Sequence, residues 1–407
     1  MKKYSGAILI FAVCYLAYMI TYISRQSLSM ATSVIKELKI MDAAQIGILG
    51  SIFSAVYSCG RLINGRLGDK IPPRILVPTG LMLIAISNFS FGFFPPFPVL
   101  ALLWAINAFG QSTMWGCMLV VLGNTLPPEK LSRGMSIYTT VLSVGTIAGI
   151  FAATGAINIK GVSYAFFVPG VLGAVFAIVT AVAYKGVKLK AEEKSAKAEI
   201  FSLKDILREK EPISSIFPAF CHGVIKDNIT LWMSVYFVER FAVNLESSAL
   251  FIFLIPAFGL VGRLLYPSVY TLCKNDFKKV NVLAFLTCGA FSLPLVFIRS
   301  SADFSVLLPV IAAFCLGMIN LCINILNHSL LAVFPLEFSK NGATSTISGI
   351  LDFFAYFGAA ASSLFYGFLL KYTDYSYMYL SWVIVCVAAG VFTLCKVMKS
   401  KGKKQNF

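Results

Sequence analysis

Six ionisable side chains lie within long apolar stretches of this chain, where a charge is costly. They are Arg25, Arg61, Lys226, Asp227, Arg263 and Asp352. A charged side chain that faces lipid at mid-bilayer costs at least about 2.5–3.5 kcal/mol, so such residues face a cavity or a partner instead. Four of the six are basic and two are acidic. A polar cavity with this surplus of positive charge favours an anionic ligand.

Arg25 and Lys226 each lie near the middle of an apolar stretch, and Arg25 follows a run without charge over residues 6–24. They occupy equivalent places in the two halves of the chain. Two cations that face each other across a cavity repel, and a dianion between them removes that repulsion. We therefore expect both residues to bind the substrate. The alternative is a structural ion pair with Asp227 or Asp352.

Other polar and aromatic side chains recur at helical spacing beside these cations. One stripe holds Tyr18, Tyr22 and Arg25, and a second holds Asn107, Gln111 and Trp115. Such aromatic stripes are often packing rather than binding, and for the second stripe both roles stay open. His222 lies one turn before Lys226, and its role is open between ligand contact and packing. For Arg61 and Arg263 the alternatives are lining the cavity or gating, with an ion pair as a further option for Arg263, whereas we expect His328 to be structural.

The composition indicates a protein whose main solvent is lipid. Of the 407 residues, 58% are hydrophobic and 13% are charged, and the mean hydropathy is +0.81. A soluble protein has about 45–50% apolar and about 25% charged residues. Twelve apolar runs are long enough to cross a bilayer: 7–33, 46–68, 75–94, 97–123, 134–157, 163–184, 213–238, 247–272, 279–299, 303–334, 341–369 and 375–398.

These runs form two related sets of six, separated by a hydrophilic segment. Gly60-Arg61-Leu62 in the second run has a counterpart in Gly262-Arg263-Leu264 in the eighth. Duplicated halves with the substrate site at the midplane are how many secondary transporters are built. We predict an all-α polytopic membrane protein with twelve transmembrane helices in two pseudo-symmetric bundles. Its parts are a six-helix bundle at 1–184, a cytoplasmic linker at 185–212, and a second bundle with a basic cytoplasmic tail at 213–407.

The basic residues predict the orientation. Most of the 34 Lys and Arg residues fall in the termini and in loops on one side, and that side is cytoplasmic by the positive-inside rule. We expect a multi-pass protein of the plasma membrane, with both termini in the cytoplasm and the chain monomeric. The formal net charge of +16 then reflects topology, and we expect no binding to nucleic acid.

Residue usage argues against an enzyme, a cofactor and a metal site. The ten cysteines are scattered without a CxxC pair, and there are only two histidines. The phosphate-binding pattern GxxxxGK[ST] is absent, and no catalytic constellation is present. The expected partners are the lipid bilayer and a small anionic solute, namely a phosphate ester, phosphate or a carboxylate.

The loop after the second run carries a family resemblance. Its "GRLGDKIPPR" resembles the signature of the major facilitator superfamily, whose fold matches the twelve-span prediction. The resemblance implies that Gly65 permits close helix packing. It also implies that Asp69 forms inner-gate ion pairs with the loop cations Lys70, Arg74 and Arg133.

Within that superfamily the chain most resembles the organophosphate:phosphate antiporters, which include glycerol-phosphate and hexose-phosphate transporters. "YISRQSLSMA" resembles the motif whose arginine binds phosphate, "NAFGQSTMWG" resembles the pattern that carries Gln111 and Trp115, and "FFAYFGAA" around Tyr356 fits the eleventh span. Tyr356 thereby joins the implied substrate site. Two positions depart from the family, because its second phosphate-binding arginine aligns with Lys226 and a histidine of the glycerol-phosphate members aligns with Leu142.

The expected function is secondary transport of a small organic anion by alternating access, with a phosphorylated metabolite exchanged for inorganic phosphate. One alternative is a proton- or sodium-coupled symporter for a carboxylate such as a sugar acid, with Asp227 or Asp352 as the titrating group. The other alternative is a receptor that senses a sugar phosphate without transporting it.

Overall fold

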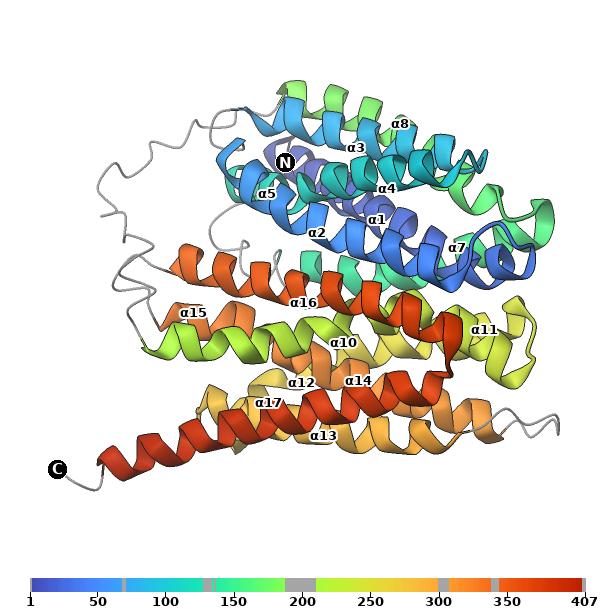
Figure 1. The fold of residues 1–407 in the computed structure, drawn as a ribbon. Helices are drawn as coiled ribbons and strands as arrows, with labels where there is room; N and C mark the ends of the chain where they lie inside the picture. The colour runs from blue at the N-terminus through green and yellow to red at the C-terminus, as the bar shows by residue number, and fades with distance from the viewer. Residues whose placement is uncertain are drawn as a thin grey trace. The chain divides into compact units, whose positions relative to one another are not determined.

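The computed structural model describes residues 2–67, 71–126, 134, 137–186, 210–298, 307–337 and 344–404. All regular secondary structure within these ranges is helical (Figure 1). The helices are α1 (Lys2–Glu37), α2 (Ala43–Leu67), α3 (Pro73–Phe91), α4 (Phe97–Ser112), α5 (Met114–Thr125), α7 (Val141–Lys160), α8 (Tyr164–Ala183), η1 (Tyr184–Gly186), α10 (Lys210–Phe241), α11 (Leu245–Ile252), α12 (Leu254–Leu272), α13 (Phe277–Phe297), α14 (Leu307–His328), η2 (Ser329–Val333), α15 (Phe334–Leu336), α16 (Thr344–Tyr372) and α17 (Tyr375–Lys404). The all-α class predicted from the sequence is confirmed.

Each of the twelve predicted spans overlaps a helix of this structure. In the described part of the chain, eleven helical segments are long and apolar enough to cross a membrane. The one remaining predicted span, the seventh (213–238), lies in α10, whose 32 residues include Lys226, Asp227, Glu239 and Arg240. These charges lower the hydropathy of α10 although its length suffices for a crossing. Lipid offers no partners for backbone N–H and C=O groups, so helices satisfy them internally.

The chain divides into two compact units. Unit 1 comprises Met1–Ala196 with Asn244–Ala249, and unit 2 comprises Lys197–Val243 with Leu250–Phe407. The division at 185–212 that we expected from the sequence stays a prediction, because residues 187–209 lie outside the described ranges.

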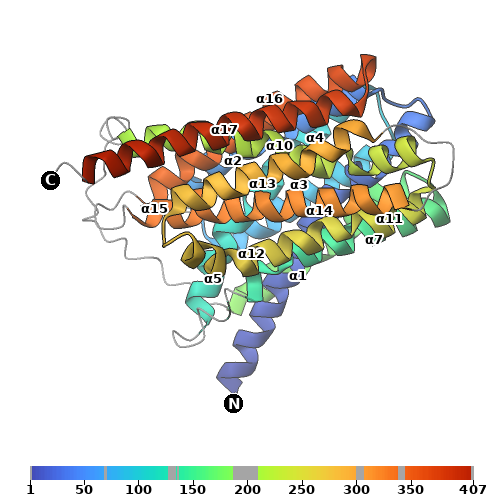
Figure 2. The same ribbon diagram turned by 90° about the horizontal axis from the view of Figure 1, so that it is seen from below.

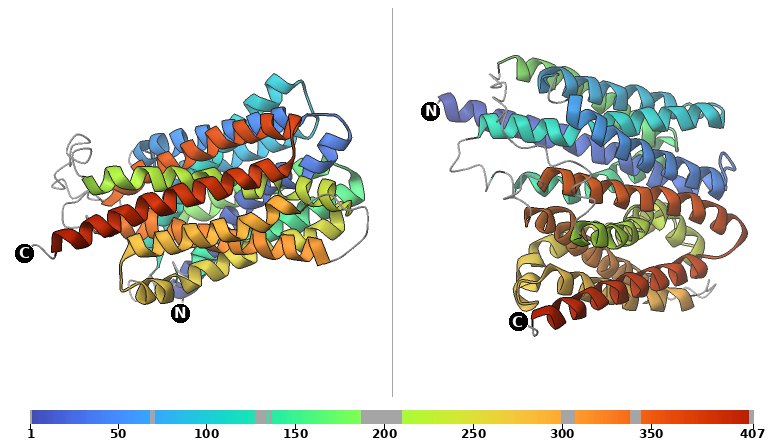
Figure 3. Two further views of the ribbon diagram at one scale, coloured as in Figure 1. Left: turned by 60° about the horizontal axis from the view of Figure 1, so that its bottom comes forward. Right: turned by 60° about the vertical axis from the view of Figure 1, so that its left-hand side comes forward.

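Unit 1 is built from pairs of helices in close contact, α1 with α7, α3 with α8 and α2 with α4 (Figures 1 and 3). Glycines set two of these contacts. A Cβ atom on Gly149 of α7 would lie 2.9 Å from the Cβ atom of Gln26 on α1, and one on Gly170 of α8 would lie 2.9 Å from the backbone nitrogen of Phe89 on α3. Small residues let membrane helices approach closely enough for dispersion contacts to hold them together.

Unit 2 repeats this construction with α10 against α16, α12 against α14, and α13 against α17. Figure 2 shows α17 (red) running beside α13 (orange). A Cβ atom on Gly262 of α12 would lie 2.5 Å from the backbone oxygen of Leu321 on α14. The α12–α14 pair therefore has a fixed register at the glycine next to Arg263.

Three of the predicted spans are not continuous α-helices. Thr113 separates α4 from α5, and Phe253 separates α11 from α12. The tenth span changes to a π-helical turn at Ser329–Val333. Hydropathy alone did not predict these interruptions, because it measures how apolar a stretch is and not whether its helix is continuous.

Candidate functional site

The basic residues of unit 1 lie against aromatic rings of α2. The guanidinium carbon of Arg25, on α1, is 4.8 Å from the ring centroid of Phe53 and 5.9 Å from that of Tyr57. The guanidinium carbon of Arg61 is 6.0 Å from the same Tyr57 ring. Phe53, Tyr57 and Arg61 follow one another at intervals of one helical turn, so they share a face of α2. Two guanidinium groups therefore approach one tyrosine ring within this unit.

Tyr18 and Trp115 belong to an aromatic cluster in the same unit. The ring of Tyr18 packs edge-on against Tyr22 at 5.4 Å, at 5.7 Å from Trp115, and stacked on Tyr138 at 5.8 Å. Trp115 also stacks on Tyr138 at 6.0 Å. Tyr138 is completely buried, and its hydroxyl has no hydrogen-bond partner among the described residues. Tyr138 thus packs against two aromatic residues that we predicted from the sequence, Tyr18 and Trp115, although we did not predict Tyr138 itself.

Gln111 forms a hydrogen bond within its own helix, α4. Its Nε2 atom donates to Oδ1 of Asn107, one turn earlier on α4, at 2.7 Å. The two amides therefore share a helix face, as their spacing indicated. Trp115 follows on α5, beyond the interruption at Thr113, and contacts the aromatic cluster described above.

In unit 2, Lys226 and Tyr356 are in direct contact. The Nζ atom of Lys226, on α10, lies 4.1 Å from the ring centroid of Tyr356, on α16. A cation over a tyrosine ring gains about 0.5–2 kcal/mol, and the gain rises as water is excluded. Two turns after Tyr356, the buried Ser362 and Ser363 bond Asn228 of α10 at 2.8 Å and 3.1 Å. Polar contacts thus join α10 and α16 on the same stretch that carries the lysine.

The contact between Lys226 and Tyr356 depends on two glycines. A Cβ atom on Gly223 would lie 1.7 Å from the carbonyl oxygen of Ala355, and one on Gly358 would lie 2.3 Å from that of Phe220. Real Cβ atoms do not approach that closely, so only glycine allows the backbones of α10 and α16 this proximity. The backbone contact fixes the register in which the lysine faces the tyrosine ring.

The other polar residues of α10 and α16 have different surroundings. His222 is fully buried, and its Nε2 atom lies 3.2 Å from the carbonyl oxygen of Ile323 on α14. Its Nδ1 atom has no hydrogen-bond partner within the described ranges. Asp227 and Asp352 are half-buried, and each has an interaction partner. His222 therefore links α10 to α14, one turn away from Lys226.

The paired arginines of the internal repeat have different partners. Whereas Arg61 faces a tyrosine ring, Arg263 donates from Nε to Oδ1 of Asn324 at 2.9 Å. Asn324 in turn donates to the carbonyl oxygen of Asn320 at 2.8 Å. His328, at the end of the same helix, packs its ring against that of Tyr266 at a centroid distance of 4.5 Å, with the two planes tilted by 59°. Polar side chains thus join α12 to α14 in unit 2.

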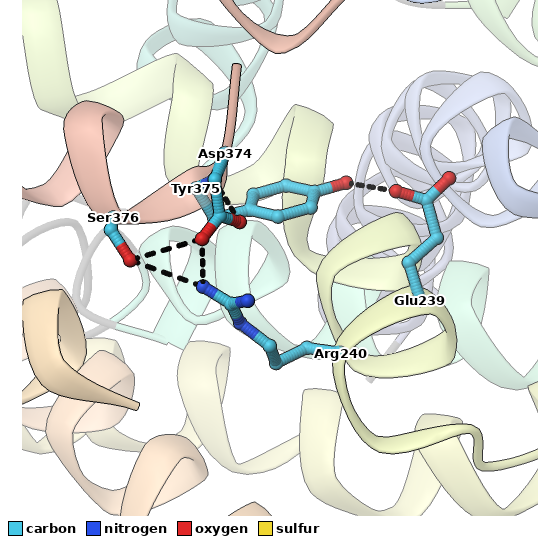
Figure 4. Close-up of polar contacts among 5 residues, drawn as sticks. All are labelled: Glu239, Arg240, Asp374, Tyr375 and Ser376. Carbon is cyan, nitrogen blue, oxygen red and sulfur yellow. Dashed lines mark hydrogen bonds and ion pairs between the residues drawn. The ribbon is translucent and has the colours of Figure 1, made fainter. Parts of the chain in front are cut away.

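A second polar network lies at the C-terminal end of α10 (Figure 4). Arg240 donates to Asp374 at 2.8 Å and to Ser376 at 3.2 Å, and the Tyr375 hydroxyl donates to Glu239 at 2.8 Å. The Arg240 side chain is 8% exposed and that of Asp374 is 45% exposed. The network joins the end of α10, which carries Lys226, to the start of α17.

The predicted inner gate is described only in part. Gly65 lies in α2, and Arg74 lies exposed in α3. Asp69, Lys70 and Arg133 lie outside the described residues. The ion pairs expected among them stay a prediction.

The chain is similar to known membrane transport proteins. A family model described as Major Facilitator Superfamily matches residues 14–345. A probable hexose phosphate transport protein of Chlamydia muridarum is 26% identical over 391 residues, which cover 86% of this chain and 82% of that protein. The phosphoglycerate transporter protein of Salmonella typhimurium is 25% identical over 284 residues, which cover 67% of this chain and 58% of that protein. A probable L-galactonate transporter of Escherichia coli is 23% identical over 400 residues, which cover 92% and 85%.

A solved structure shares the fold. The crystal structure of the nucleoside transporter NupG aligns with a TM-score of 0.75 at 13% sequence identity, covering 95% of this chain and 98% of that one. At this identity the likeness concerns the path of the helices alone.

Proposed function

Because the chain belongs to the Major Facilitator Superfamily, we propose that it exchanges a phosphorylated metabolite for inorganic phosphate across a membrane. As a member of that family, it is a multi-pass membrane transporter and not an enzyme. We further propose that it works as a monomer in the plasma membrane with both termini in the cytoplasm. The hexose phosphate and phosphoglycerate transporters among its relatives support a phosphate ester as the solute.

The observation that carries this proposal is the pair of guanidinium groups at Tyr57. Arg25 and Arg61 both approach that ring, at 5.9 and 6.0 Å. An anion that contacts both groups interacts favourably with two positive charges at once. A guanidinium offers a planar fork of N–H donors that matches phosphate oxygens in a bidentate manner. The phosphate group of the solute is the chemical part that fits two such forks.

Lys226 supplies the charge in the second unit. Its ammonium group lies 4.1 Å from the centroid of the Tyr356 ring. Lysine gives up the bidentate geometry of arginine but keeps the full positive charge. We propose that Lys226 neutralises the anion and that Arg25 and Arg61 recognise its shape. Alternating access then follows if the six-helix bundles rock about the bound anion.

A carboxylate symporter is the second candidate. It is favoured by the L-galactonate transporter among the relatives and by the acidic residues Asp227 and Asp352 within the predicted spans. A titrating carboxylate would couple uptake to protons. The sensor alternative is favoured by a membrane sensor protein of Salmonella typhimurium among the relatives, which is 32% identical over 97 residues.

Thermal-shift measurements on the purified protein separate the candidates. Inorganic phosphate, a hexose phosphate, a triose phosphate and a sugar acid are each titrated at constant ionic strength. A ligand that binds only the folded protein stabilises it by about 2.7 kcal/mol at 100 times its Kd. We expect phosphate and at least one phosphate ester to raise the Tm of the wild type, and Arg61→Ala to abolish that rise. Stabilisation by the sugar acid alone would reject phosphate exchange in favour of the symporter.

A further inference from the structure

A chain of buried hydrogen bonds leads from the interior of unit 1 to Gln111. Asn88 of α3 donates from Nδ2 to the hydroxyl of Ser24 on α1 at 2.6 Å. Ser24 and Asn107 of α4 are paired in both directions, with the hydroxyl 3.4 Å from Oδ1 and 3.3 Å from Nδ2. Asn107 Oδ1 then accepts from Gln111 Nε2 at 2.7 Å. Four polar side chains from three helices are thus connected.

These residues are shielded from water. Ser24, Asn88 and Asn107 are 0% exposed and Gln111 is 5% exposed. An amide in an apolar interior costs free energy unless it is hydrogen-bonded. Asn88 anchors the first of these hydrogen bonds, because its Nδ2 atom also donates to the Ile84 carbonyl oxygen at 2.8 Å. The series of hydrogen bonds is therefore anchored at Asn88 and ends at Gln111.

The direction of donation along these hydrogen bonds determines which atom Gln111 can offer to an anion. A glutamine amide has two N–H donors and one oxygen acceptor, and rotating the amide by half a turn exchanges them. With Nε2 committed to Asn107 through one hydrogen, the second hydrogen of the same nitrogen is still available as a donor. In the opposite orientation the amide would present its oxygen, which repels an anion.

We propose that Asn107, supported by Ser24 and Asn88, is a positioning residue that holds the Gln111 amide with its nitrogen toward the substrate anion. Asn107 does not itself touch the substrate. Its carbonyl oxygen selects one of two amide orientations and so makes Gln111 a contact for anions. This proposal rests on the proposed function, in which Gln111 lies in the anion site.

A double-mutant cycle between Asn107→Ala and Gln111→Ala tests this role, with Km and kcat measured for phosphate exchange in proteoliposomes. Hydrogen bonds between membrane helices contribute about 0.6–1.7 kcal/mol, which corresponds to roughly 3- to 20-fold. We expect each single variant to raise Km by that order with kcat within about twofold. Because Asn107 acts through Gln111, removing both side chains should raise Km no further than Gln111→Ala alone does.

Two further variants make the result decisive. Asn281→Ala, which removes a buried amide from α13 in unit 2, should be additive with Gln111→Ala. If Asn107→Ala does not fold, Asn88→Ala weakens the chain one step further back, with an expected Km rise of about two- to threefold. Additive effects of Asn107→Ala and Gln111→Ala, or a fall in Tm without a change in Km, would overturn the proposal.

The proposed function can fail independently of this result. It fails if the wild type does not exchange phosphate. The cycle is then measured with whichever anion the wild type transports, and non-additivity between Asn107 and Gln111 still decides the positioning role.

Discussion

Replacing Arg25 by alanine should weaken phosphate binding strongly while the protein still folds. The Arg25 guanidinium lies over Phe53 at 4.8 Å and near Tyr57, so the change removes a donor held in place by aromatic rings. A hydrogen bond to a charged group contributes about 1.5–3 kcal/mol, which is roughly 10- to 150-fold in Kd. Folding should survive because alanine is well suited to the interior of the long helix α1.

The size of the effect should follow geometry as well as charge. Arg25→Lys keeps the charge but loses the fork of donors and most of the stacking on Phe53, so we expect a loss of about tenfold, within the range for one charge-assisted hydrogen bond. Lys226→Arg should keep affinity or improve it by adding bidentate contacts. Lys226→Ala should match Arg25→Ala in its loss of affinity.

Isothermal titration of purified variants with inorganic phosphate gives the Kd values, and Tm measured without ligand reports folding. Suppose that Arg25→Ala leaves Kd unchanged and lowers Tm by several degrees. Arg25 would then be half of a structural ion pair, as the alternative from the sequence had it, and the anion site would lie elsewhere.

Three further predictions concern the stability of unit 2. Gly223→Ala should destabilise the protein by at least about 1–3 kcal/mol, because the new Cβ would overlap a carbonyl oxygen of α16, whereas Gly155→Ala has open space and should stabilise its helix by about 0.5–1 kcal/mol. Asp374→Ala leaves the buried Arg240 guanidinium without its carboxylate and should cost about 1.5–3 kcal/mol. Partial desolvation of the exposed Glu337, followed by the nearby carboxylate of Glu211, raises the pKa of Glu337 above its ordinary 4.5. The charged form is thus disfavoured in the folded state, so stability falls as pH rises through the raised pKa, and Glu337→Gln should raise Tm near pH 7.5 but not near pH 4.

Thermal denaturation in detergent measures all three. A Gly223→Ala protein as stable as Gly155→Ala would contradict the close approach of α10 and α16. Asp374→Asn retains an acceptor oxygen and should lose less than Asp374→Ala. Equal Tm gains for Glu337→Gln at both pH values would show that its ionisation does not affect folding.

The fold could be predicted from the sequence because lipid restricts the backbone conformations that can cross a membrane. Apolar runs of spanning length become helices, since the backbone has no other way to satisfy its polar groups. The interruptions at Thr113 and Phe253 and the π-turn at Ser329–Val333 were not accessible. They depend on how neighbouring helices pack, which hydropathy does not encode.

The candidate site could be predicted from the sequence only where its residue types are rare inside a membrane. Arg25 and Lys226 stood out because charges in apolar runs are costly. Phe53 and Tyr57 did not, because aromatic residues are common in spans. Their spacing before Arg61, at one and two helical turns, was the available signal. Asn88, a single amide in an apolar helix, gave no indication of its contact with Ser24, since that contact joins residues far apart in the chain.

Exchange itself is tested most directly by counterflow. Proteoliposomes are loaded with unlabelled phosphate and diluted into a trace of labelled hexose phosphate, with no proton or sodium gradient. Phosphate exchange predicts transient accumulation of label above its external concentration, which disappears when internal phosphate is omitted or when Arg25→Ala replaces the wild type. Uptake that ignores internal phosphate and requires an imposed proton or sodium gradient would contradict exchange and identify a symporter.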